Sequence, residues 1–166
     1  PYWFDVDTRS GIGCYGPGYI HWGIQSNFNY ASAMATLASS EGASKKSLRL
    51  DRAKAALKFS MASHLTGNRT GLAGKKWGNS WISMLGIERG MHGINRLIPH
   101  LSEEDRDHLK RMLVSEANWV LNDARRGKKT GVFAALWNHE GNVSESNVWW
   151  ATLLWRVSRM FPEEAN

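Results

Sequence analysis

The sequence is poor in cysteine and has no long apolar run. Its single cysteine, Cys14, cannot form an internal disulfide or a cysteine-rich zinc site. No uninterrupted apolar stretch reaches the roughly 18 residues of a transmembrane helix, and the residues from Pro1 to Asp5 lack the basic and apolar regions of a signal peptide. No metal-ligand spacing stands out either. We therefore expect no membrane span, no intact signal peptide, no bound metal and no cofactor.

Length and composition indicate one packed domain. The chain has 166 residues, of which 42% are hydrophobic and 22% charged. This length suits a single domain of about 100–200 residues, and the apolar fraction is sufficient for a core. Tryptophan is unusually frequent, with nine residues, several of which stand beside Gly, Asn and His in loop-like stretches. Burial alone would not place them there.

The charge balance favours an anionic partner. Lys and Arg exceed Asp and Glu by 21 to 15, which gives a net charge of +6 and a pI near 9.7. Acidic polysaccharides and nucleic acids both bind to positively charged protein surfaces. No zinc-finger spacing, RNP-like motif or long basic helix supports nucleic acid. The basic clusters also suit solvated loops and helix ends: Lys45-Lys46, Lys75-Lys76, Arg125-Arg126 and Lys128-Lys129.

Hydrophobic periodicity predicts an all-α protein after an irregular, Gly- and aromatic-rich segment over 1–28, which leaves room for an extended stretch. We expect five helices. The first is short, over 29–38, and the second has an apolar stripe from Ala53 to Leu65. The third is buried and runs from Trp81 to Ile98, the fourth is capped by Ser102 and ended by Gly127, and the fifth runs from Ser144 to about Phe161. In the third helix, Gly86, Gly90 and Gly93 recur on one face, which allows close approach of another backbone.

The helix order is repetitive. Three helix starts are rich in Asn and aromatic residues, at 27–30, 79–81 and 147–150. The first two lead into a turn and an amphipathic helix, as stacked helical hairpins do. We therefore expect three hairpins, the last one incomplete.

This pattern resembles the (α/α) toroid of six-hairpin carbohydrate-active enzymes. The similarity is to the N-terminal toroid of heparinase II/III-like and alginate-lyase-like polysaccharide lyases, and two stretches support it: Gly78-Asn79-Ser80-Trp81 with Glu88-Arg89-Gly90, and the segment from Gly141 to Trp150. The resemblance implies an incomplete toroid, an acidic polysaccharide substrate and a periplasmic or secreted location. Family members have more hairpins and a β-rich domain, so the remainder of a longer chain, or a partner chain, is expected to complete the ring.

The resemblance also implies catalytic residues for β-elimination, which needs a group that neutralises the uronate carboxylate, a base and an acid. Asn79 matches the position of the neutralising group, although Ser80 stands where such lyases often have His or Trp. Asn138 is the alternative. His139, whose imidazole titrates near neutrality, is the candidate base. Tyr15 or Tyr19 is the candidate acid.

Indole rings suit the apolar faces of sugars. We expect substrate contacts from loop-facing tryptophans and their neighbours: His21, Trp22, Trp77, Trp81, Trp137, Asn138, Asn147 and Trp149. Helix packing is an equal alternative for Trp81 and Trp149. We assign three further tryptophans to packing: Trp119, Trp150 and Trp155.

Two other functions stay open. A noncatalytic helical-repeat module would bind a glycan or protein without turnover. A glycoside hydrolase on the same fold would need paired carboxylates, for which the loop acids Asp5, Asp7, Glu140 and Glu145 are available, but their spacing singles out no pair.

Overall fold

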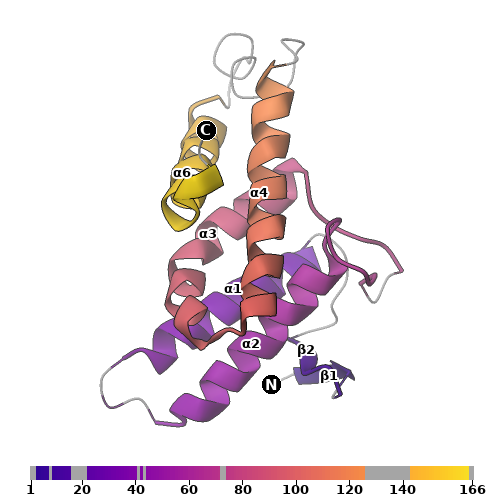
Figure 1. Ribbon diagram of the computed structural model, residues 1–166, viewed down its shortest axis with the longest axis vertical. Coiled ribbons are helices and arrows are strands. Elements are labelled where there is room, and N and C mark those ends of the chain that lie inside the picture. The colour runs from indigo at the N-terminus through magenta and orange to yellow at the C-terminus, as the bar shows by residue number, and fades with distance from the viewer. Residues whose placement is uncertain are drawn as a thin grey trace.

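The computed structural model describes residues 3–7, 9–15, 22–40, 42, 44–71, 74–125 and 143–164, without the side chains of 3–6, 22–24, 81, 123–125 and 143–147. The described part is mostly helical (Figure 1), which confirms the expected helical class. Its elements are β1 (Trp3–Asp7), β2 (Ile12–Tyr15), α1 (Trp22–Ala38), α2 (Lys46–Ser63), α3 (Trp81–Leu97), α4 (Glu103–Arg125) and α6 (Val143–Met160), with 3-10 turns η1 (Ile98–His100) and η2 (Pro162–Glu164). No helix in these ranges is long and apolar enough to cross a membrane.

The segment expected to be irregular over 1–28 contains two extended strands and, contrary to the prediction, the first turns of α1. Strands β1 and β2 form an antiparallel hairpin with an irregularity between Asp5 and Asp7. The side chain of the buried Asn27 binds the backbone of β2 as a neighbouring strand would. Its amide accepts from the Tyr15 N–H over 2.5 Å and donates to the Tyr15 carbonyl over 3.0 Å. Helix α1 begins at Trp22, ahead of the predicted start, because its packing outweighs the weak helix propensity of its Gly, Asn and aromatic residues.

The glycine face of α3 packs against α1, as predicted. A Cβ atom on Gly86 would strike the Gln25 side chain, and one on Gly93 would strike the backbone oxygen of Ser32. The contacts advance in the same direction along both helices, so α1 and α3 run parallel. The glycines therefore set how closely the two backbones approach.

The ends of α3 and α4 follow local signals. Ser80 caps α3 in a capping box with Ser83, and the Ser102 hydroxyl accepts from the Asp105 N–H over 3.1 Å at the start of α4. Pro99 lies within η1, the short turn that separates the two helices. Helix α4 consequently returns past α3 (Figure 1).

Helix α1 lies against both α2 and α3, and α6 packs on α3 and α4. The apolar faces of these helices share one core cluster, whose larger buried members include Phe28, Leu57, Phe59, Met61, Met84, Ile87, Met91, Ile94, Leu109, Met112, Leu113 and Leu153. The polar residues that this core encloses are few, and several of them belong to one network.

Candidate functional site

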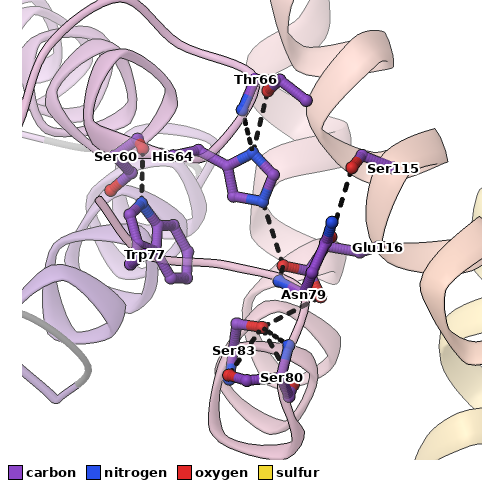
Figure 2. A network of polar contacts seen from close by, with 9 residues as sticks. All are labelled: Ser60, His64, Thr66, Trp77, Asn79, Ser80, Ser83, Ser115 and Glu116. Atoms are coloured by element: carbon purple, nitrogen blue, oxygen red, sulfur yellow. Dashed lines mark hydrogen bonds and ion pairs between the residues drawn. The ribbon is translucent and has the colours of Figure 1, made fainter. Parts of the chain in front are cut away.

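A buried polar network joins the end of α2, the start of α3 and the middle of α4 (Figure 2). Its centre is the pair His64 and Glu116, neither of which has exposed surface. His64 is held next to Trp77 by backbone hydrogen bonds of Leu65 and Ser63 to Trp77. These bonds join the end of α2 to the segment that leads into α3.

Glu116 accepts three hydrogen bonds. Its Oε1 atom lies 3.1 Å from Nε2 of His64 and 2.7 Å from the backbone nitrogen of Asn79, and its Oε2 atom accepts from the Ser83 hydroxyl over 3.0 Å. A buried carboxylate is tolerated when donors surround it in this way. The carboxylate thus ties α4 to the first residues of α3 and to His64.

The surroundings of His64 select one tautomer. The Thr66 backbone N–H donates to Nδ1 over 3.1 Å, and the Thr66 hydroxyl lies 2.8 Å from the same atom. Nδ1 must be unprotonated to accept this N–H, so the proton of the ring is on Nε2 and points to Glu116. The ring is also fixed edge-on to Trp77, with 5.5 Å between the ring centroids.

Asn79, the predicted carboxylate-neutralising residue, is positioned by this network. Its backbone is left-handed, with φ 47°, a conformation that Asn adopts more readily than most residues. Its Oδ1 atom accepts from the Ser115 hydroxyl over 3.2 Å, and the cap of α3 is Ser80. The side chain of Asn79 is therefore not used as a helix cap.

Asn79 lines a surface pocket of about 570 Å³ along α4. The pocket is formed by Thr66, Asn79, Arg111, Val114, Ser115, Asn118, Trp119 and Asn122. Arg111, Ser115, Asn118 and Asn122 follow i, i+4, i+7, i+11 spacing and so form one polar stripe of the helix. The pocket combines amides, hydroxyls, one guanidinium and one indole, which are groups that suit a polar ligand with a negative charge and an apolar face.

Arg111 also affects the helix residue one turn before it. Burial lowers the pKa of the His108 imidazole below its ordinary 6.5, and the positive charge of Arg111 lowers it further. His108 is therefore a neutral side chain next to the only cation among the residues that form this pocket. Its titration reports on the charge around Arg111.

Several predicted site residues lie outside the described residues: Tyr19, His21, Trp137, Asn138 and His139. For three more, Trp22, Trp81 and Asn147, only the backbone is described, at or near the first turns of α1, α3 and α6. Of the two predicted catalytic residues that the structure describes, Asn79 and Tyr15, Asn79 lines the pocket.

Trp77 and Tyr15 do not belong to this pocket. Trp77 is 2% exposed, and its Nε1–H donates to the Ser60 carbonyl over 2.8 Å, so the prediction that it stacks on a sugar is wrong. Tyr15 stacks on Tyr30 with 4.6 Å between ring centroids, next to the β-hairpin. Neither residue contributes to the pocket because each is occupied by packing contacts of its own.

The remaining tryptophans sort differently from the sequence prediction. Trp149 is half-buried with the guanidinium of Arg89 over its ring, 5.7 Å from the centroid. Trp150 is buried, as expected, but Trp155 is 62% exposed and Trp119 lines the pocket. The assignment of Trp155 to packing is wrong because its ring is exposed on α6, whereas Trp119 is partly buried and packs against the core as expected, besides lining the pocket.

Sequence reasoning missed the α4 side of the pocket. Arg111, Asn118 and Asn122 look like a solvated helix face, and only the combination of two Asn, one Arg and an adjacent Trp on such a face signals a binding surface. Among the described residues, no group of three His, Cys, Asp or Glu side chains is placed to hold a metal ion. Comparisons with protein-family models, curated proteins and solved structures give no match.

Proposed function

We propose that the pocket along α4 binds an acidic, uronate-containing polysaccharide and that the protein cleaves it by β-elimination. The observation that supports this function is the presence of Asn79 and Arg111 in the same pocket. An amide and a guanidinium are both donors that neutralise a carboxylate, and neutralising it acidifies the neighbouring C–H bond. Trp119 adds a face for the sugar ring.

The network behind the pocket supports a preorganised role for Asn79. The backbone of Asn79 is bound to the buried Glu116 and its side chain to Ser115, so its amide is held in one orientation. A donor that is fixed in advance stabilises developing charge without reorganisation. In this proposal His139 is the base and Tyr19 the acid.

The helix order supports the finer fold proposal, an incomplete (α/α) toroid. Helices α1 and α3 run parallel, and each is followed by a helix that returns past it, in the order of inner and outer helices of a ring. We further propose that another part of a longer chain, or a partner chain, completes the ring and that the protein functions in the periplasm or outside the cell.

Binding without turnover is the second candidate. Among the residues that form the pocket there is no His, Tyr, Lys or carboxylic acid, so no general acid or base is supplied by them. A hydrolase is less well supported, because Glu116, the carboxylate that binds the Asn79 backbone, has no exposed surface and is bound to three donors.

The test uses the full chain with alginate, polygalacturonate and heparan sulfate, and measures the ultraviolet absorbance of the unsaturated product. Asn79→Ala should lower kcat/KM by about 10²–10³, the usual loss for one donor to a developing oxyanion. Asn68→Ala, which removes an exposed amide outside the pocket, is the matched control. Unchanged turnover in Asn79→Ala would contradict the lyase, and binding of these polymers without any unsaturated product would favour the noncatalytic module.

A further inference from the structure

A second hollow lies between α3 and α6, outside the proposed reaction site. It has a volume of about 320 Å³ and is lined by Met91, His92, Asn95, Trp155, Arg156, Arg159 and Met160. Two arginines, an amide and an exposed indole line one small cavity. Guanidinium, amide and indole groups also line the pocket along α4.

The charge of this hollow is positive. Arg159 is exposed and makes no ion pair within the described part of the chain. The Nε atom of Arg156 is buried without a hydrogen bond, and the nearest carboxylate oxygen, on Glu88, lies 3.8 Å away. Arg96 adds a further positive charge beside His92, to whose Nε2 it donates over 3.3 Å. Three guanidinium groups therefore lie in or beside the hollow, and only that of Arg156 is recorded next to a carboxylate, so an anion would bind favourably.

A third hollow shares lining residues with both positive sites, and its one acid, Glu164, is paired with Lys110. This hollow, of about 520 Å³ between α4 and α6, shares Val114, Asn118 and Asn122 with the pocket along α4. It shares Trp155 with the hollow between α3 and α6. The three hollows thus adjoin, with Arg111 near one end, Arg156 and Arg159 near the other, and the indole of Trp155, 62% exposed, between them.

We propose that the hollow between α3 and α6 is a second subsite for an anionic group of the same glycan, so that the preferred ligand is a long polyanionic chain. This inference rests on the proposed function. Arg111 would bind one carboxylate or sulfate, the chain would cross the amides of Asn118 and Asn122 and the ring of Trp155, and Arg159 would bind a later anionic group. An extended ligand gains affinity from both ends because the second contact is made within the complex.

The test compares affinities for a uronic-acid disaccharide and for a long oligosaccharide of the same polymer, by calorimetry at fixed salt. Arg159→Ala should weaken binding of the long chain about tenfold, because a hydrogen bond to a charged group is among the stronger contacts. Trp155→Ala should act in the same direction, and both variants should bind the disaccharide as the parent protein does. Arg9→Ala, which removes the same charge from the turn after β1, is the control and should change neither affinity.

The outcomes separate the two proposals. If Arg159→Ala leaves the affinity for the long chain unchanged, or weakens the disaccharide equally, the second subsite is wrong. If Arg111→Ala has no effect on either ligand while Arg159→Ala weakens the long chain, the pocket along α4 fails as the glycan site and the anionic subsite stands. Both arginines are exposed or half-exposed, so thermal unfolding of the variants should match the parent and exclude misfolding.

Discussion

Nε2 of His64 lies 3.1 Å from Oε1 of Glu116, and neither side chain has any exposed surface. The pair joins the end of α2 to the middle of α4, and the same carboxylate oxygen accepts from the backbone of Asn79. Because Asn79 is also held by Ser115, the buried pair orients one wall of the pocket. If the proposed function holds, a change in this pair should affect both stability and ligand binding.

Glu116→Gln should destabilise the fold by about 1–3 kcal/mol, the cost of leaving a buried donor without an acceptor. The glutamine has one NH2 group in place of a carboxylate oxygen. That group would face either the N–H donors of His64 and Asn79 or the hydroxyl donor of Ser83, so at least one former hydrogen bond is lost. Urea unfolding measures the change. Asp107→Asn, an exposed acid on the same helix, should stay within about 0.5 kcal/mol of the parent. Equal stability of the two variants would contradict the structural role of Glu116.

Substitution of Trp77 should lower stability without affecting binding, whereas substitution of Trp119 should weaken binding. Trp77→Phe removes the hydrogen bond to the Ser60 carbonyl and should cost about 1–3 kcal/mol of unfolding free energy without changing the affinity for uronate polymers. Trp119→Leu keeps an apolar side chain but removes the ring from the pocket, and should weaken binding about tenfold. Denaturation of both variants measures their stability, and calorimetry measures their affinity. If only Trp77→Phe binds more weakly, Trp77 and not Trp119 contacts the ligand.

The imidazole of His108 should report ligand binding at Arg111. Its pKa is lowered by burial and by the charge of Arg111, and a bound carboxylate cancels part of that charge. The pKa of His108 should therefore rise when a uronate oligosaccharide binds, as measured by NMR titration. Arg111→Ala should raise the same pKa in the absence of ligand and abolish the response. A pKa that is insensitive to saturating ligand would place the anion elsewhere.

Asp7 and Arg69 predict a defined pH dependence. Hydrogen bonds from Arg69 and Ser10 lower the pKa of the Asp7 carboxyl from its ordinary 3.8 to about 2. Because the native value lies below the unfolded one, the contribution of Asp7 to stability is fully present above pH 3.8 and is lost as the pH falls through about 2. NMR titration should return the pKa of Asp7 toward 3.8 in Arg69→Ala. A pKa still near 2 in that variant would show that the turn residues alone lower it.

Local signals predicted much of the helical framework. The start at Trp81, the Ser102 cap and the glycine face of α3 agree with the structure, because they depend on capping hydrogen bonds, on periodicity and on the size of one side chain. The start of α1 at Trp22 was missed, because its first turns combine weak helix formers that local propensity does not favour. The strands of the N-terminal hairpin are too short to show alternation.

The site was predictable only in part. Asn79 stood out by its place before a helix, but its partners Ser115 and Glu116 are more than 30 residues away. In the sequence Glu116 resembles any acid on an amphipathic helix, and nothing local shows that three donors surround it. Trp77 was wrongly expected at the substrate, and the pocket face of Trp119 was missed, for the same reason: exposure of an indole depends on what packs over it.

The sequence by itself determined most of the helical framework, the glycine face of α3 that admits another backbone, and the positive charge that favours an anionic partner. These properties follow from neighbours within a few turns and from composition. Only the tertiary structure decided that His64 and Glu116 are buried together and that Asn79 lies in one pocket with Arg111 and Trp119. These properties depend on contacts between distant segments, which form when the apolar faces of the helices leave water and the enclosed polar groups must find partners.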